Sequence, residues 1–389
     1  MRIAAVIAEY NPFHNGHAFH LKETRKCGAD AVVAIMSGNF VQRGEPALIS
    51  KWARAEAAVR CGVDLVVELP VFWATGRAQR FADGAVSAAI GLGCVDMLSF
   101  GSECGDVSRI CRAADVLALT AVPKDLLDTG VTFAAARETA VRAADESCAQ
   151  LLRTPNDTLA VEYALSARRR CADFELLAVA RACAHDGLPV GNTVGASYIR
   201  RYLDDENTLL YCPPESAAVL RREINAGRVV RDLRALERML LLRLRLASAQ
   251  EIAALADVSE GLENRILSAA KQADSIESLC SAVKSKRYTY ARIRRILLSF
   301  LLGIRERDVP DDVPYVRILA IGVRGEEVLR RIKRSGALPI LSKRTNVSSL
   351  SADAGRVFAA ECAAAEVYAA LQQRLGAAGS EHTTPIFKI

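Results

Sequence analysis

Short apolar runs alternate with helical patterns along the first half of the chain. The runs are apolar throughout rather than at every second position, and they lie at residues 2–8, 30–36, 62–70, 97–101 and 174–181. Patterns of helical period separate them, at residues 16–27, 50–61, 80–92, 133–153 and 159–170. Fully apolar strands separated by helices are typical of a parallel sheet covered on both faces. We therefore predict an α/β fold with a Rossmann-like doubly wound parallel sheet.

The pattern changes after Pro213-Pro214. Residues 216–305 have helical periodicity almost throughout, with breaks expected at Gly261 and near Asp274. A strand, a helix, a short strand and a long helix are then predicted at residues 315–321, 325–336, 339–342 and 355–375, and the last residues, 376–389, are expected to be poorly ordered apart from Ile386-Phe387. This order predicts an α/β domain over residues 1–205, a mainly helical domain over residues 206–310 and a small α/β segment over residues 311–389.

Composition is that of an ordinary globular enzyme, with 51% hydrophobic and 25% charged residues. No apolar run approaches the roughly 18 residues that span a bilayer. The apolar N-terminal run meets Glu9 too early for a signal peptide, so we expect a cytoplasmic protein with no membrane partner. The eleven cysteines include no C-x-x-C pair, which favours small buried side chains over a metal site or disulfides.

Positive charge is concentrated in one part of the chain. Residues 284–344 hold sixteen Lys or Arg against six Asp or Glu, a net of +10 within a chain whose total is +6. Such asymmetry favours a polyanionic partner for this part. The alternative for a charge run is a set of solvated helix faces.

A histidine pair follows the first predicted strand, in Glu9-Tyr10-Asn11-Pro12-Phe13-His14-Asn15-Gly16-His17. Ligands of parallel sheets bind beyond the carboxyl ends of the strands. A helix that begins near Gly16 would direct its free N–H groups and positive dipole end toward that position, a ready phosphate site. His14 and His17 fall on one face and can donate to phosphoryl oxygens. No third ligand follows at a metal-binding interval, so no metal is assigned to them.

This arrangement resembles the H-x-G-H signature of the nucleotidyltransferase superfamily. That superfamily has a second phosphate motif near the end of its catalytic domain, and Gly195-Ala196-Ser197-Tyr198-Ile199-Arg200 stands in the corresponding place. Gly195 replaces the serine expected at the start of the motif. Ser197 is then predicted to cap the following helix, and Arg200 to offer a bidentate fork to phosphate.

Further blocks resemble one subfamily, the bacterial tRNA(Met) cytidine acetate ligases. They are the segment 8–17, the segment 36–47, Phe100-Gly101-Ser102-Glu103, Pro155-Asn156-Asp157-Thr158-Leu159 with Glu162-Tyr163, and Lys286-Arg287-Tyr288-Thr289. The resemblance implies ATP-dependent activation of acetate to acetyl-adenylate. It also implies transfer of the acetyl group to N4 of the wobble cytidine of elongator tRNA(Met), which gives N4-acetylcytidine.

The resemblance also implies a nucleotide site within residues 1–205. Its catalytic residues would be His14, His17 and Arg200. The expected ATP-binding residues are Ile7, Ala8, Glu9, Tyr10, Asn11, Pro12, Phe13, His14, Asn15, Gly16, His17, Ala18, Phe19, His20, Gly101, Asn156, Arg181, Ser197 and Arg200. Mg²⁺ is expected because ATP chemistry normally brings it.

Two further segments complete the prediction. In the loop over residues 37–47, Gly38 and Gly44 bracket Gln42, Arg43 and Glu45, and its position predicts that it lines the acetate or cytidine pocket; the alternative is an ordinary surface loop. In the helical part, Tyr288 and Tyr290 are each open to a core or a base-stacking role. The expected tRNA-binding residues are Lys284, Lys286, Arg287, Arg292, Arg294 and Arg295.

Two other functions share some of these features. A small-molecule adenylyltransferase would share the phosphate site but has no use for a large basic domain. A nucleotide-gated RNA-binding protein without catalysis would use both parts of the chain. Acetylation of tRNA that requires both ATP and acetate separates these alternatives.

Overall fold

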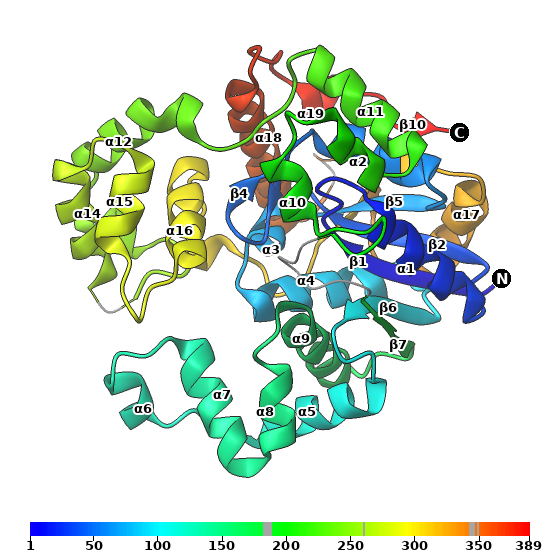
Figure 1. Ribbon diagram of the computed structural model, residues 1–389, viewed down its shortest axis with the longest axis horizontal. Helices are drawn as coiled ribbons and strands as arrows, with labels where there is room; N and C mark the ends of the chain where they lie inside the picture. The colour runs from blue at the N-terminus through cyan, green and yellow to red at the C-terminus, as the bar shows by residue number, and fades with distance from the viewer. Residues whose placement is uncertain (182–188, 260, 342–346, 348–349) are drawn as a thin grey trace.

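The computed structural model describes residues 1–181, 189–259, 261–341, 347 and 350–389 (Figure 1). Cys183, Lys343 and Arg344, which entered the cysteine and charge arguments, lie outside these ranges. Of the helices in the described ranges, none is both long and apolar enough to cross a membrane.

A twisted sheet at the centre of the molecule has the strand order β10-β8-β5-β2-β1-β6-β7, with β9 paired to β8. The five strands expected from the apolar runs are β1 (Ile3–Ala8), β2 (Ala31–Ser37), β5 (Leu65–Leu69), β6 (Met97–Ser102) and β7 (Glu175–Ala180). They are parallel to one another, with β1 in the middle and the chain winding outward on each side. The predicted doubly wound α/β fold is confirmed.

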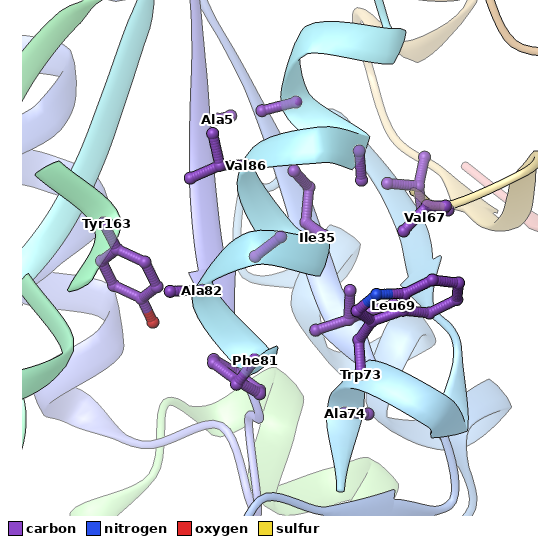
Figure 2. Packing of buried hydrophobic residues seen from close by; sticks show 14 of the residues in the cluster. Ala5, Ile35, Val67, Leu69, Trp73, Ala74, Phe81, Ala82, Val86 and Tyr163 are labelled. Carbon is purple, nitrogen blue, oxygen red and sulfur yellow. The ribbon is translucent and has the colours of Figure 1, made fainter. Parts of the chain in front are cut away.

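Helices cover both faces of this sheet, chiefly α1 (Asn15–Lys26), α2 (Lys51–Arg60), α3 (Val71–Ala74), α4 (Ala78–Gly91) and α9 (Pro155–Arg169). Figure 2 shows Ala82 and Val86 of α4 facing Ala5 and Ile35 of the central strands, with Tyr163 and Trp73 on either side. Small residues let this helix approach closely. Gly84 is required there, because a Cβ atom would lie 2.3 Å from the Trp73 ring.

The segment between β6 and α9 adds four helices, drawn in cyan to green in Figure 1: α5 (Val107–Leu119), α6 (Lys124–Asp128), α7 (Phe133–Ala144) and α8 (Glu146–Leu151). The single helix predicted over residues 133–153 was wrong, because it divides at Asp145. That carboxylate accepts hydrogen bonds from the backbone N–H groups of Ser147 and Cys148, at 2.9 and 3.2 Å. It therefore caps the start of a new helix.

The chain after β7 returns to the sheet before it leaves for a helical lobe. α10 (Ala196–Arg201), η1 (Glu206–Tyr211) and α11 (Pro214–Asn225) pack beside α2. The lobe, on the left in Figure 1, consists of η2 (Arg234–Leu236), α12 (Glu237–Leu246), α13 (Ala249–Ala253), α14 (Leu262–Gln272), α15 (Ile276–Val283) and α16 (Tyr290–Leu302). Its separate core includes Leu244, Ile266 and Ile293.

The C-terminal segment joins the sheet of the first domain. After η3 (Glu306–Asp308) come β8 (Val316–Ile321), α17 (Gly325–Ser335), β9 (Ile340–Leu341), α18 (Ala352–Leu371), α19 (Ser380–Thr383) and β10 (Phe387–Lys388). β8 pairs antiparallel with β5, so the sheet is parallel except at this position. The expectation of a poorly ordered tail was wrong, because β10 pairs with β8 and α19 places Glu381 in the interior.

A buried cluster of charges joins α2 and β5 to this C-terminal segment. The Lys51 ammonium lies 2.5 Å from Glu68, 2.8 Å from Glu381 and 3.5 Å from Glu361. Arg317 lies 3.2 Å from Glu381 and 3.8 Å from Glu68. The Lys51 and glutamate side chains are at most 1% exposed. Two cations therefore face three glutamates in the protein interior, where charges are tolerated when they are paired.

Candidate active site

A pocket of about 390 Å³ opens at the carboxyl ends of β1, β6 and β7, within the usual range for small-molecule sites. Its wall comes from the loop after β1, the starts of α1, α4 and α9, and the loop after β2. Of the predicted ATP-binding residues, thirteen line it: Ile7, Ala8, Glu9, Tyr10, Asn11, His14, Gly16, His17, Phe19, His20, Gly101, Asn156 and Arg181.

The two histidines form the N-terminal cap of α1. The His14 Nδ1 atom accepts a hydrogen bond from the Gly16 N–H at 3.0 Å, and the His17 Nδ1 atom accepts one from the His14 N–H at 3.2 Å. The rings stack with their centroids 3.8 Å apart. Because each Nδ1 atom is an acceptor, each neutral ring carries its proton on Nε2. The helix start therefore presents two Nε2–H donors together with its own N–H groups.

Burial keeps these histidines neutral. Burial, helped by Arg181 and Arg200, lowers the pKa of His14 to about 3. Burial, helped by Arg181, lowers the pKa of His20 to about 4. Burial, followed by His14 and Arg181, lowers the pKa of His17 well below its usual value. An arriving polyanion would be met by neutral donors and by two guanidinium charges nearby.

These depressed pKa values predict that the free protein loses stability in mild acid. Below pH 6.5 the unfolded chain takes up protons on these histidines and the folded chain does not, so the free energy of unfolding falls as the pH falls. At pH 5 His14 and His20 each account for about 2 kcal/mol of the loss. Urea unfolding at pH 7 and pH 5 measures the loss, and His20→Asn should make it smaller by about 2 kcal/mol. Equal pH dependence in the two proteins would contradict the prediction.

Arg54 anchors the backbone of the loop after β1 and of the loop after β2. Its fully buried guanidinium donates to the carbonyl oxygen of Glu9 at 2.6 Å, to that of Ser37 at 3.1 Å, and also to that of Gly38. Burial lowers its pKa to about 10, which leaves it charged at neutral pH. One side chain thereby fixes the ends of both β1 and β2. Tyr10 follows with φ of 44°, a left-handed conformation held by ring contacts with Phe13 and His17.

The second phosphate motif meets the first across the pocket. α10 begins at Ala196, with Gly195 as its N-cap and no side-chain cap. The predicted cap role of Ser197 was wrong, because the helix begins two residues earlier than that role requires. The Arg200 guanidinium donates to the carbonyl oxygen of Asn11 at 2.8 Å, although the residue lies outside the pocket lining.

The other predicted ATP-binding residues do not line the pocket, and two of them contact neighbouring segments. The residues absent from the lining are Ser197, Pro12, Phe13, Asn15 and Ala18. Asn15 donates to the carbonyl oxygens of Asn192 and Leu210, at 2.8 and 3.2 Å. The buried Phe13 accepts a hydrogen bond at its carbonyl from Ser216 at 2.7 Å.

A carboxylate fixes Asn156 on the opposite wall. One oxygen of Glu103 accepts from the Asn156 side-chain amide at 2.6 Å, and the other accepts from the Asp157 N–H at 2.8 Å. Because the Asn156 side-chain N–H₂ group donates to Glu103, its side-chain oxygen points away from that carboxylate. Arg181 packs over Gly101, with its Cγ atom 3.6 Å from where a Cβ would stand.

The loop after β2 links the pocket to the basic helix. It forms a small hairpin of β3 (Phe40–Val41) and β4 (Glu45–Pro46), and Gln42 and Arg43 at its tip line the pocket. Gly44, with φ of 73°, lies against the α16 backbone, where a Cβ would stand 2.5 Å from the Arg295 nitrogen. Glu45 pairs with Arg294. The pocket and the helical lobe therefore share one wall.

The six predicted tRNA-binding residues lie at the start of α16 and in the turn before it. Arg295 binds Asp257 at 2.7 Å, and Arg292 donates to the Asp257 carbonyl at 3.0 Å, so both also brace the lobe. Arg287 donates to the Leu127 carbonyl at 3.3 Å. Lys284 and Lys286 are exposed, as is Tyr290, whereas Tyr288 belongs to the lobe core.

Sequence patterns missed Arg54, Glu103 and Phe81. Arg54 lies on a predicted helix whose charged positions looked solvated. Glu103 closes a block that resembled the family, but nothing nearby in sequence showed that it would hold Asn156. Phe81 lines the pocket from the start of α4. Its only signal was an apolar position in a helix.

Stacked histidines at a helix start, at the carboxyl end of a parallel sheet, define a HIGH nucleotidyl transferase. The model of that family, described as HIGH Nucleotidyl Transferase, matches residues 1–382. The chain is 36% identical over 409 residues to the tRNA(Met) cytidine acetate ligase of Thermoanaerobacter sp. strain X514 and 37% identical over 408 residues to that of Caldanaerobacter subterraneus subsp. tengcongensis, each match covering both chains completely. It belongs to the tRNA(Met) cytidine acetate ligase family.

The fold agrees with that of a solved relative along its whole length. The crystal structure of Thermotoga maritima TmcAL bound with alpha-thio ATP matches with a TM-score of 0.92 and 32% identity, and covers 100% of both chains. The apo form of the same protein also matches with a TM-score of 0.92.

Proposed function

We propose that this protein activates acetate with ATP and transfers the acetyl group to N4 of the wobble cytidine of elongator tRNA(Met). The observation that carries the proposal is the pair of Nε2–H donors, His14 and His17, at a helix start in the pocket. Relatives that match over their full length are named for this ligation, and one of them binds an ATP analogue.

The geometry supports acyl adenylation as the first step. An acetate oxygen attacks the α-phosphorus of ATP, and negative charge builds on the pyrophosphate that leaves. His14, His17 and the N–H groups of α1 would donate to that charge, with Arg181 and Arg200 as the nearby cations. No protein atom needs to bond to the substrate, so orientation supplies most of the catalysis.

Mg²⁺ is proposed as the companion of the nucleotide. Across the described ranges, no three His, Cys, Asp or Glu side chains are grouped to hold a metal ion. Mg²⁺ keeps several waters and binds phosphate oxygens readily, so the nucleotide itself fits as its main ligand.

The tRNA would approach along the wall that the hairpin shares with α16. Lys284 and Lys286 are exposed there beside Tyr290, which is 40% exposed and suited to stack on an unpaired base. Arg287, Arg292, Arg294 and Arg295 would contribute positive charge while bracing the lobe. This assignment supports the predicted polyanionic partner.

Glu103→Gln should weaken ATP binding. The substitution removes one of the two carboxylate oxygens that hold Asn156 and the start of α9, and it leaves the Asn156 amide free to turn. A lost charged hydrogen bond of about 1.5–3 kcal/mol predicts roughly a tenfold or greater rise in the Kd for ATP. Titration calorimetry measures it, with Glu263→Gln on the lobe as the control. An unchanged Kd would contradict the role given to Glu103.

The function is tested by leaving out one substrate at a time. Full-length protein is incubated with ATP, acetate and a tRNA(Met) transcript, and the nucleosides are analysed by mass spectrometry. N4-acetylcytidine should form only when all three are present. Acetylation without acetate, or none with all three, would overturn the proposal.

A further inference from the structure

Glu9 is the one carboxylate among the described residues that line the pocket. The other ionisable groups there are tyrosines, histidines and arginines. Arginine stays protonated at working pH. Burial, followed by the charge of Glu9, raises the pKa of Tyr163 far above neutrality, and burial does the same to the pKa of Tyr10. Only the carboxylate and the histidines are therefore able to accept a proton.

The three histidine rings already make hydrogen bonds to other protein atoms. Each of His14 and His17 uses its Nδ1 lone pair to accept a backbone N–H and keeps its proton on Nε2. The His20 Nε2 atom lies 2.8 Å from the Ser99 hydroxyl. His14 and His17 therefore have no lone pair left for a substrate, and the His20 ring is anchored to Ser99, whereas Glu9 has a second carboxylate oxygen besides the one that Gln42 binds.

Both the side chain and the backbone of Glu9 accept hydrogen bonds. One of its carboxylate oxygens accepts from the Gln42 N–H at 3.0 Å, and its backbone carbonyl accepts from Arg54 at 2.6 Å. The residue therefore lies at the boundary between two parts of the pocket. On one side the chain runs into the histidine loop, and on the other lies the hairpin that reaches α16.

We propose that Glu9 is the general base that removes the proton from cytidine N4 during acetyl transfer. The inference rests on the function proposed above. The N4 nitrogen forms a bond to the acetyl carbon, the bond from that carbon to the phosphate oxygen breaks, and AMP leaves with the electron pair. The N4 proton passes to the Glu9 carboxylate and from there to water. A cytosine amino group is a weak nucleophile, so a fixed carboxylate beside it promotes the step.

The position of Glu9 fits this role better than a role in the first step. Adenylation consumes acetate already as an anion and releases no proton, so it needs no base. Transfer to N4 does. A carboxylate held by the hairpin, which is the wall nearest the proposed tRNA path, stands where the nucleoside enters.

The test separates the two half-reactions in full-length Glu9→Gln. Because Glu9 also lines the nucleotide pocket, acetate-dependent ATP–pyrophosphate exchange sets the baseline for this variant. Acetyl transfer to tRNA should fall on the order of a hundred-fold further than exchange does. Glu23→Gln, which removes the same charge from an exposed pair with Lys26 on α1, should leave both rates unchanged.

Two outcomes would overturn the role of Glu9, and a third would overturn the function on which it rests. Normal transfer in Glu9→Gln would overturn the role, and so would an equal loss of exchange and transfer, which would assign Glu9 to nucleotide binding. If wild-type protein shows neither reaction, the proposed function itself fails. The pH profile is the second readout: Glu9→Asp should keep the acid limb of the transfer rate, and Glu9→Gln should lose it.

Discussion

Replacing His17 with alanine should lower acetate-dependent ATP–pyrophosphate exchange by a hundred-fold or more. The substitution removes an Nε2–H donor from the place where charge builds on the leaving pyrophosphate, and donors of this kind are worth about 2.7–4 kcal/mol. It also removes the acceptor for the His14 N–H at 3.2 Å. The loss should fall mainly on kcat, because the donor acts most strongly on the charge that develops in the transition state.

A second variant, His17→Asn, tests whether the loss comes from the missing hydrogen bonds. His17→Asn retains a side-chain oxygen to accept the His14 N–H and an amide to donate, so it should recover part of the exchange rate. His382→Ala changes a histidine on α19, outside the pocket lining, and should have normal exchange. Exchange at the wild-type rate in His17→Ala would remove the basis for assigning the pocket to adenylation.

Lys51→Met should destabilise the fold by about 3–5 kcal/mol, because it leaves buried carboxylates without their partner. Lys51 contacts Glu68, Glu361 and Glu381, and among the residues that the structure describes Arg317 is the other cation in contact with these glutamates. Chemical unfolding of the full chain measures the change. The cost should also reach the pocket, since Gly38 of the hairpin loop lies against Glu68.

Glu361→Gln is the matched variant, and it should cost less than about 1 kcal/mol. Burial and the neighbouring Glu68 raise the pKa of Glu361 well above its usual value. Lys51 and Arg317 lower the pKa of Glu68 although burial opposes them. Glu361 is therefore the protonated member, and an amide of the same shape replaces it without a change in charge. A loss equal to that of Lys51→Met would show that Glu361 is ionised.

The sheet was predictable because its strands are short and continuously apolar. β1, β2 and β5 are buried along almost their whole length. Because helices cover both faces of these strands, their sequences are apolar at nearly every position and stand out from the helical segments. The histidine loop was predictable for a related reason, since its chemistry lies within one short segment at a strand end.

Contacts between distant segments were not predictable in the same way. Lys51 and Arg54 have the spacing of a solvated helix face. Only the folded chain supplies the partners of Lys51, from β5, α18 and α19, and those of Arg54, the carbonyl oxygens of Glu9 and Ser37. The antiparallel entry of β8 beside β5 also depends on the chain returning to the sheet after the helical lobe. Asp145 divided a helix through one capping side chain, a local effect that competes with periodicity.

The hairpin after β2 gives the two proposed half-reactions a physical connection. Its tip residues line the pocket, and its glycine turn lies on the α16 backbone beside the Glu45–Arg294 pair. A tRNA that binds the lobe would thus contact an element that reaches the adenylation site. A side chain at position 44 would break that contact, because a Cβ there would stand 2.5 Å from the Arg295 nitrogen.

The fate of the acetate oxygen tests the central claim most directly. The protein is incubated with ATP, tRNA(Met) and acetate whose two oxygens are the heavy isotope, and the nucleotide products are examined by mass spectrometry. If acetyl-adenylate forms, one acetate oxygen stays on the α-phosphate, so AMP should carry a single heavy oxygen for each acetylcytidine made. Unlabelled AMP, or ADP with the heavy oxygen in inorganic phosphate, would contradict activation at the α-phosphate.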